Sequence, residues 1–277
     1  MHCHNICGKL ILKGGVTGKE KLHTIPINEA FASADECPFC WLERETEQRA
    51  INYTIGPGAS YMEPEIRAVT DAEGFCGHHL KMMHDYGNAL GCALILQTYY
   101  IGMLQELEQQ LEEYELPPKK SLFRRKPVQT EKASLIDWME KKQGSCFVCN
   151  RTKENMQRYF DTFFAMLKDP EFRVSVEQSR GFCMRHFHRL LEEAERSIPN
   201  GQRDWFHKTV RSLMWENLIR VKEDIDWFVM KNDYRNAGKD WKTSRDAVSR
   251  GIQKLQGGHP SDPVFRSADF GIKTPGR

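Results

Sequence analysis

Eight cysteine and histidine residues recur along the chain at spacings that suit metal ligation. A Cys-x-x-Cys pair is followed, after 35 intervening residues, by a Gly-Phe-Cys-x-x-His motif, and the same order returns later with 33 residues between the pairs. Residues three apart share one face of a helix, so each pair can aim two donor atoms at one point. The candidate ligands are Cys37, Cys40, Cys76, His79, Cys146, Cys149, Cys183 and His186.

Three thiolates and one imidazole form the closed tetrahedral shell that zinc takes in structural sites. We expect two zinc ions per chain, each held by a Cys-x-x-Cys pair and the Cys-x-x-His pair that follows it in the same half. No coordination position stays open, so we expect the metal to stabilise the fold and we assign no catalytic residues. Buried structural cysteines would explain one quartet more easily than two. An iron–sulfur cluster is the alternative, although clusters more commonly use four cysteines.

Other residues with ligand chemistry lie close to these motifs. His78 competes with His79 in the first motif, but only His186 stands at the matching position of the second, which selects His79. His188 has no such counterpart. Cys92 lies outside both quartets within an apolar segment, which indicates a core residue.

The elements that must position these ligands are helices. Apolar residues repeat at helical spacing and no segment alternates as a strand does, so the predicted fold is all-α. Pro64 and Pro170 precede the two Gly-Phe-Cys motifs by ten and eleven residues, which indicates an internal duplication. We expect two pseudo-repeated halves packed as one bundle-like unit. The predicted order is a disordered leader (1–18), helical repeat 1 with metal site 1 (19–116), a linker (117–130), helical repeat 2 with metal site 2 (131–257) and a C-terminal tail (258–277).

Three local predictions concern single segments. Ile25, Pro26 and Ile27 suggest an extended stretch before the first short helix. Residues 41–53 are rich in charge and predict an exposed helix with a narrow apolar stripe. The most apolar stretch, 89–104, is about 16 residues long, short of the roughly 20 that a membrane-spanning helix needs, and predicts a buried core helix.

Charge and composition limit the classes of partner. The 277 residues include 40 basic and 38 acidic side chains, a formal net charge of +2, which gives no general field for nucleic acid or acidic lipid. We therefore expect neither nucleic acid nor a membrane as partner. The chain opens without the pattern of a secretion signal, so we place it in the cytoplasm, where thiols stay reduced and can ligate metal. We interpret the soft ligands of the leader, His2, Cys3, His4 and Cys7, as coincidental.

Short motifs in a fixed order run along the chain. They are Lys21 to Phe31, Cys37 to Cys40, Ser60 to Glu63, Gly74 to Cys76, Glu154 to Tyr159, Gly181 to Cys183 and Asp246 to Leu255. Together they resemble a family of proteins from anaerobic Gram-positive bacteria described as a domain of unknown function (DUF6062), over about residues 19–263. The resemblance implies a cytoplasmic bacterial protein with the metal quartets, and it brings no activity with it.

Three functions are compatible with these observations. The leading hypothesis is a non-enzymatic helical scaffold whose zinc sites support the binding of another molecule, either a protein or a small molecule. The second is a thiol redox sensor that releases zinc and forms Cys37–Cys40 and Cys146–Cys149 disulfides. The third is an enzyme or small-molecule binder with a cleft between the halves, lined by polar residues of one helix that we interpret as a solvated, salt-bridged face. Those residues are Asn150, Arg151, Glu154, Arg158 and Asp161.

Overall fold

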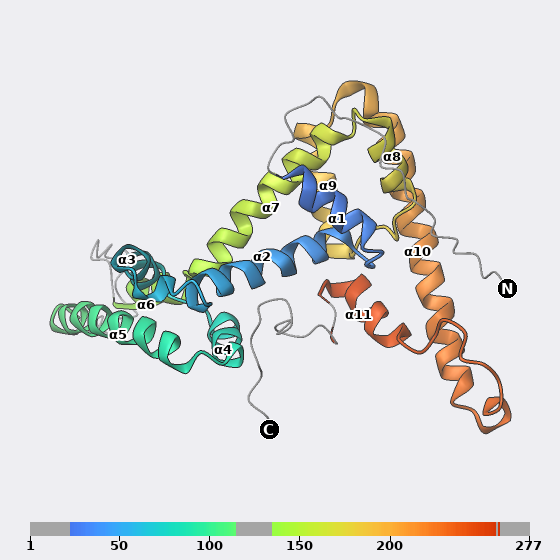
Figure 1. Ribbon diagram of the computed structural model, residues 1–277. Coiled ribbons are helices and arrows are strands. Elements are labelled where there is room, and N and C mark those ends of the chain that lie inside the picture. The colour runs from blue at the N-terminus through green and yellow to red at the C-terminus, as the bar shows by residue number, and fades with distance from the viewer. Residues whose placement is uncertain (1–22, 115–134, 259, 261–277) are drawn as a thin grey trace, which may run out of the picture.

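The computed structural model describes residues 23–114, 135–258 and 260. These residues form helices joined by turns, with no strand among them (Figure 1), so the predicted all-α class is confirmed. The predicted leader, the predicted linker and nearly all of the predicted C-terminal tail lie outside the described residues. Among the helices that are described, none combines the length and the apolar character needed to cross a membrane.

The order of elements is the same in the two halves of the chain. Each half has a helix, a second helix that begins at the Cys-x-x-Cys pair, a short helix that begins at a proline, a helix that begins at the Cys-x-x-His pair, and a long helix. The duplication itself stays a prediction. The first half contains α1 (Thr24–Ala32), α2 (Pro38–Ile55), α3 (Pro64–Glu73), α4 (Gly77–Tyr86) and α5 (Ala89–Glu112). The second contains α6 (Leu135–Gly144), α7 (Phe147–Met166), α8 (Pro170–Glu177), α9 (Met184–Ser197) and α10 (Arg203–Lys231), and α11 (Ala247–Gln256) follows.

Helices α2 and α7 pack along each other in antiparallel directions at the centre of the molecule (Figure 1). Phe39, at the start of α2, stacks on Phe160 near the end of α7 with ring centroids 4.4 Å apart. At the opposite ends, Ile51 of α2 lies in one apolar cluster with Phe147 of α7. The helix predicted over 41–53 is confirmed, but its predicted exposure is wrong: α7 packs along α2, and only Arg49 and Tyr53 of these residues are exposed.

The antiparallel pair divides the apolar interior into two cores. The larger core surrounds the start of α2 and collects side chains from α1, α7, α8, α9 and α10. The smaller core surrounds the start of α7 and collects side chains from α2, α4 and α5. Each core contains cysteine residues, so each candidate metal site adjoins one of the two apolar cores.

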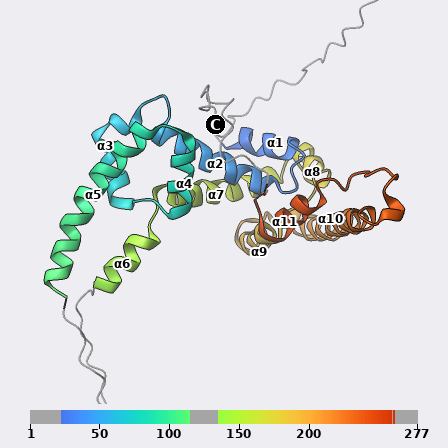
Figure 2. The ribbon, with the colours of Figure 1, turned by 90° about the horizontal axis from the view of Figure 1, so that it is seen from below.

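Helix α5 projects from the body as an arm (Figure 2), with α3 packed against its first half, where Thr98 donates to Asp71, and α6 beside its second half, where Trp138 donates to Glu106. Of its 24 residues, only Gly91 and Ile95 are buried. The helix predicted over 89–104 is confirmed, but its predicted burial in the core is wrong, because the described part of the protein covers only one side of it. The extended stretch predicted around Pro26 is also wrong, since α1 begins at Thr24 and accepts proline in its first turn, where no intrahelical amide bond is lost.

Candidate metal centres

Four helix N-termini carry the eight candidate ligands. The first cysteine of each pair is the residue that precedes a helix, and the second ligand follows three residues later within the first turn. The amide groups of a first turn lack partners inside the helix, and together they make this end of the helix partially positive. The arrangement therefore favours thiolates. Two amides of these first turns donate to a cysteine sulfur. The amide of His186 donates to Cys183 Sγ at 3.4 Å, and the amide of Cys149 donates to Cys146 Sγ at 3.5 Å.

Glycine sets the chain direction immediately before each Cys-x-x-His pair. Gly74 and Gly181 both have positive φ, 65° and 72°, a conformation that residues with a side chain rarely adopt. A Cβ at Gly181 would also lie 3.3 Å from the carbonyl oxygen of Leu213. The carbonyl of Gly74 accepts a hydrogen bond from the amide of Phe147, the first residue of α7, at 2.9 Å. The glycine of the Gly-Phe-Cys motif is therefore required by the turn that presents the cysteine.

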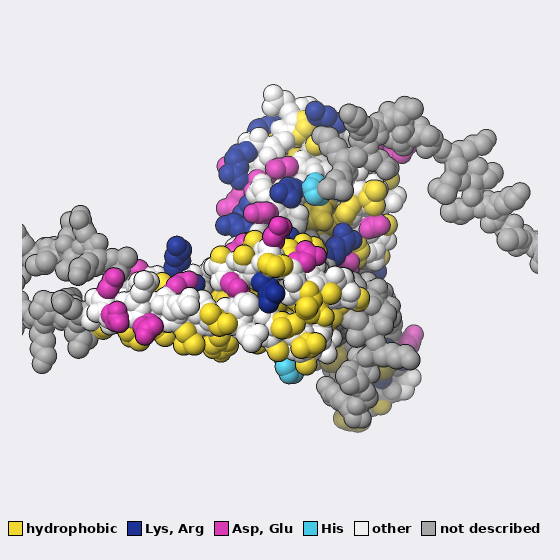
Figure 3. All heavy atoms as spheres, turned by 60° about the vertical axis from the view of Figure 1, so that its left-hand side comes forward, with side chains coloured by type: hydrophobic (Ala, Val, Ile, Leu, Met, Phe, Trp, Pro, Cys, Tyr) yellow, Lys and Arg dark blue, Asp and Glu magenta, His cyan; other side chains and the backbone are white. Residues whose placement is uncertain are grey.

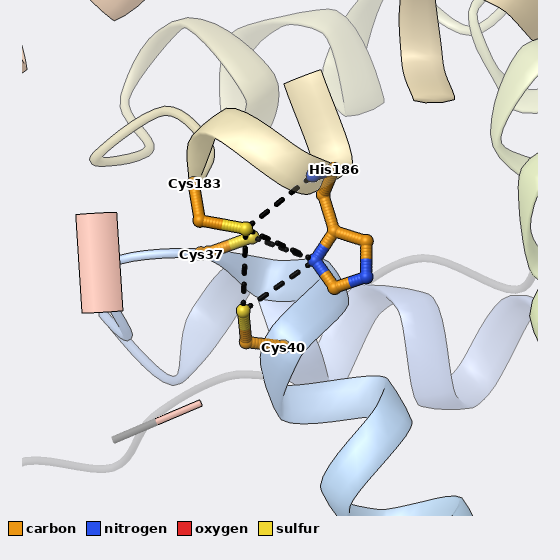
Figure 4. Close-up of side chains that lie close together, drawn as sticks. All are labelled: Cys37, Cys40, Cys183 and His186. Atoms are coloured by element: carbon orange, nitrogen blue, oxygen red, sulfur yellow. Dashed lines mark hydrogen bonds between the residues drawn. The ribbon is translucent and has the colours of Figure 1, made fainter. Parts of the chain in front are cut away.

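The first cluster, called site A here, joins the start of α2 to the start of α9 (Figure 4). Its members are Cys37, Cys40, Cys183 and His186, and all four are buried. The Nδ1 atom of His186 lies 3.4 Å from each of the three sulfur atoms. Cys40 Sγ and Cys183 Sγ lie 3.6 Å apart.

The second cluster, called site B here, joins the start of α4 to the start of α7. Its members are Cys76, His79, Cys146 and Cys149. His79 Nδ1 lies 3.2 Å from the sulfurs of Cys76 and Cys146 and 3.4 Å from that of Cys149. Cys149 is exposed and Cys76 is partly exposed, so site B reaches the surface whereas site A does not.

These separations are those of a tetrahedral metal shell. Ligands at zinc distances stand about 3.8 Å apart for two sulfurs and about 3.5 Å apart for a sulfur and a nitrogen. The sulfur pairs at 3.6 and 3.9 Å are far from the roughly 2.05 Å of a disulfide, and all of these cysteines are free. Two sets of three sulfurs and one nitrogen are thus compatible with metal binding.

The predicted pairing of the ligands within each half is wrong. Site A combines the Cys-x-x-Cys pair of the first half with the Cys-x-x-His pair of the second, and site B combines the other two pairs. Neither site therefore belongs to one half, and the predicted assignment of one complete site to 19–116 and another to 131–257 fails with it.

Helix length explains the crossed pairing. The 18 residues of α2 carry the chain about 27 Å away from Cys37 and Cys40, and the ten residues of α3 span only about 15 Å, too little to bring it back. In the second half, α7 and α8 have 20 and 8 residues, with the same consequence. Because α2 and α7 are antiparallel, the end of each lies beside the start of the other. Each Cys-x-x-His pair therefore meets the Cys-x-x-Cys pair of the opposite half.

Two glutamates of α2 face the outer nitrogens of the two histidines. Glu43 lies 3.8 Å from His186 Nε2, and Glu47 lies 3.5 Å from His79 Nε2. A histidine that binds metal through Nδ1 carries its proton on Nε2, and a carboxylate beside that nitrogen fixes the ring and raises its basicity. Arg185 also donates two hydrogen bonds to Glu43. One helix thus supplies two ligands to site A and places a carboxylate near the outer nitrogen of the histidine in each site.

In site B, the closely packed sulfur and nitrogen atoms shift the pKa values of Cys146, Cys149 and His79 in different directions. Burial and the neighbouring thiolate of Cys146 raise the pKa of the Cys149 thiol to about 12. Burial opposes ionisation of Cys146, but hydrogen bonds from His79 and from a backbone amide outweigh it and lower the pKa of Cys146 to about 6. Burial alone would lower the pKa of His79, yet contacts with Cys146 and Glu47 raise it to about 10. Metal must displace protons from the groups with a high pKa, so the affinity of the site falls as the pH falls.

The remaining sequence candidates fall outside the two clusters. His188 is exposed, and His78 is exposed beside Glu47 and His79 in a group of three side chains. Cys92 packs against the smaller core and donates to the carbonyl of Met83, which agrees with its predicted place. The polar residues of α7 are exposed, and Arg158 pairs with Glu154 at 3.9 Å, as a solvated face requires.

Comparison with protein-family models matches residues 18–262 to a family of unknown function (DUF6062). Searches of curated proteins and of solved structures gave no match. The match covers the described helices and both metal clusters.

Proposed function

We propose that this chain, which belongs to the DUF6062 family of unknown function, is a non-enzymatic, cytoplasmic helical scaffold in which two structural zinc ions support a surface that binds another protein. The proposal rests on sites A and B, each of which combines ligands from both halves of the chain. Each is a complete set of four protein ligands, so no coordination position is left for a substrate or an activated water molecule.

The proposed metal has an energetic role that follows from its position. Each ion connects two helix starts that belong to different halves, and only the folded chain brings those ligands together. The free energy of metal binding is therefore available to the folded state alone. Zinc fits three thiolates and one imidazole, while iron–sulfur clusters more commonly take four cysteines. The crossed arrangement supports an origin by duplication, since the two sites are built in the same way from equivalent helices.

Elemental analysis of untagged protein, purified without oxygen, tests the metal assignment. We expect two zinc ions per chain and no visible absorbance. Protein without metal, or protein with iron and visible absorbance, would contradict the proposal.

Removal of the ions with a chelator should lower the thermal midpoint by more than about 10 °C, because the binding free energy is lost from the folded state alone. Calorimetry of the loaded and stripped protein measures this difference.

The binding surface that the structure favours is the arm formed by α5. Positions at alternating steps of three and four residues, the spacing of a coiled-coil seam, run along the arm, and four of them carry exposed apolar side chains: Leu90, Ile101, Leu104 and Leu111. They include Leu90, which is 66% exposed, and Leu104, which is 57% exposed, and Figure 3 shows hydrophobic side chains along one edge of the arm. On a helix of 3.6 residues per turn, this stripe lies opposite the buried Ile95. The positions of the seam are Leu90, Leu94, Gln97, Ile101, Leu104, Glu108 and Leu111.

The partner we propose for this stripe is a second copy of the same helix in antiparallel orientation. Helix α5 contains no lysine or arginine, and its glutamates gather in its second half. A parallel pair would place these carboxylates beside one another. An antiparallel pair places them beside the uncharged first half of the partner helix and near its partially positive N-terminus. The 24 residues give a seam of about 36 Å.

Substitution within the stripe tests this surface. The double variant Ile101→Glu/Leu104→Glu is expected to convert a dimer to a monomer, because four carboxylates would meet at the centre of the seam. Sedimentation equilibrium measures the change. Val229→Glu is the matched control, since Val229 is 65% exposed on α10, and it should leave the dimer intact. A wild-type protein that is monomeric at concentrations of about 100 μM would contradict self-pairing, and an interaction that α5 makes only with a basic helix would assign the stripe to another partner.

A further inference from the structure

We propose that Cys149 is a site of oxidation by hydroperoxides, that its oxidation produces a Cys76–Cys149 disulfide, and that zinc then leaves site B while site A keeps its ion. The inference rests on the proposed zinc sites and adds a reactivity that distinguishes one from the other. It differs from oxidation within both Cys-x-x-Cys pairs, because it selects one site and joins two different helices.

The two clusters differ in their access to solvent. All four ligands of site A are buried, whereas Cys149 of site B is exposed and Cys76 is partly exposed. The surface at Cys149 is concave: a cavity of about 440 Å³ lies between α2, α7 and α9, and Cys149 lines it together with Glu47 and Lys153. A small hydroperoxide can therefore reach one sulfur of site B directly. The same cavity touches site A only through His186, which carries no oxidisable thiol.

Site A is covered by the end of α11. A Cβ on Gly257 would lie 3.4 Å from Cys183 Sγ and 3.0 Å from the guanidinium of Arg185, which shows how closely the backbone approaches. The amide of Gly258 hydrogen-bonds to Cys40. Lys254, which is 1% exposed, anchors this segment by donating to the backbone carbonyls of Glu36 and Arg180. Among the described residues, no comparable segment covers Cys149.

The proposed reaction transfers two electrons from sulfur to the peroxide. The zinc-bound thiolate of Cys149 attacks one peroxide oxygen, a sulfur–oxygen bond forms, the oxygen–oxygen bond breaks, and an alcohol, or water from hydrogen peroxide, leaves after protonation. The thiolate of Cys76, whose sulfur lies 3.9 Å from that of Cys149, then attacks the sulfenic sulfur. A sulfur–sulfur bond forms and hydroxide leaves. Zinc remains divalent and loses two of its four ligands, so it dissociates.

Graded oxidation of the full, zinc-loaded chain tests the proposal. The protein is treated with increasing hydrogen peroxide while released zinc is followed with a chromogenic chelator, and the remaining thiols are alkylated and mapped by mass spectrometry. We expect one equivalent of zinc to leave at least about tenfold faster than the second. The peptide that contains Cys76 should be linked to the one that contains Cys149, while Cys37, Cys40 and Cys183 stay reduced.

The variant Cys149→His separates reactivity from folding. It replaces one thiolate by an imidazole and leaves a ligand set of two cysteines and two histidines, which zinc also accepts. It should keep two zinc ions and resist peroxide at site B. Cys40→His, the matched change at site A, should leave the fast release from site B unaltered. If Cys149→His does not fold, the map of disulfides in the wild-type chain still decides the question.

The outcomes distinguish this inference from the zinc assignment itself. Two zinc ions that leave at the same rate, or earlier oxidation of Cys37 and Cys40, would overturn the selective oxidation of site B. A Cys146–Cys149 disulfide would overturn the choice of Cys76 as the partner. Protein that carries no zinc before peroxide is added would instead contradict the proposed function.

Discussion

Replacement of His186 by alanine is expected to make Cys37 and Cys40 reactive toward alkylating agents while Cys146 and Cys149 stay protected. The ligand lies in the second half of the chain, and the thiols that lose protection lie in the first. Removal of one ligand from site A should also lower the free energy of unfolding by more than about 4 kcal/mol, because the loss of a structural metal belongs to the small group of changes with large effects.

The expected result follows from the distances in site A. His186 Nδ1 is 3.4 Å from the sulfurs of Cys37, Cys40 and Cys183, and α9 brings it there from 146 residues beyond Cys40 in the sequence. Metal-bound thiolates react slowly with alkylating agents as long as the shell is complete. Quantitative mass spectrometry after a short pulse of iodoacetamide, at a denaturant concentration that keeps the variant folded, measures each thiol separately.

His79→Ala provides the reciprocal experiment. It should expose Cys146 and Cys149 and leave Cys37 and Cys40 protected, because His79 belongs to site B. Pairing within each half would give the opposite pattern, with Cys37 and Cys40 exposed by His79→Ala. His188→Ala is the neutral control, since His188 is exposed and belongs to neither cluster. The four thiols of the Cys-x-x-Cys pairs thus decide between the two pairings in one measurement.

The residues of the candidate sites could be found from the sequence because ligand chemistry depends on local spacing. Cys-x-x-Cys and Cys-x-x-His pairs bring their donors together within one helical turn, whatever the rest of the fold does. The selection of His79 over His78 rested on the matching position of His186 in the second motif, and His79 is the histidine that lies in site B. The pairing of one Cys-x-x-Cys pair with one Cys-x-x-His pair depends on the path of the chain between them. The spacing of the ligands alone does not determine that path.

One signal for the crossed pairing was nevertheless present in the sequence. A helix from Pro38 to Ile55 moves the chain about 27 Å along its axis, so a site built within one half needs an equally long return before Cys76. The glycines and proline near residue 57 end the helix and leave room for only a short one. The exposure of α5 could not be predicted from the sequence. An apolar helix has the same composition whether its apolar side is covered by its own chain or by another molecule.

The second prediction with a large expected effect on stability concerns the carboxylate of Glu36, which no sequence motif identifies. Glu36, immediately before Cys37, is 3% exposed and is surrounded by cations. Arg220 contacts it at 2.5 Å and Lys254 at 3.2 Å, while Arg180 and Arg250 lie at 3.6 and 3.8 Å. Burial lowers the pKa of Lys254, and the charge of Glu36 opposes that shift. The group joins α10, α11 and the turn between α8 and α9 to the start of α2, where site A is built.

Glu36→Gln is expected to lower the free energy of unfolding by about 3–5 kcal/mol, because it leaves the ammonium of Lys254 buried without its carboxylate. Urea denaturation of the zinc-loaded protein measures the loss. Glu140→Gln, at an exposed position of α6, is the matched control and should change stability by no more than about 0.5 kcal/mol. A loss below about 1 kcal/mol for Glu36→Gln would contradict the assigned role.

The same substitution should also change the chemistry of site A. Lys254 and Arg250 hold α11 against the body, and the end of α11 covers Cys40 and Cys183. When this anchor is weakened, the covering segment opens more often and the sulfurs of site A become accessible to peroxide. Glu36→Gln should therefore bring the rate of zinc release from site A closer to that of site B.

The double variant Glu36→Gln/Lys254→Met removes both members of the pair, so it should recover part of the lost stability. It should not restore the protection of site A, because the methionine cannot donate to the carbonyls of Glu36 and Arg180.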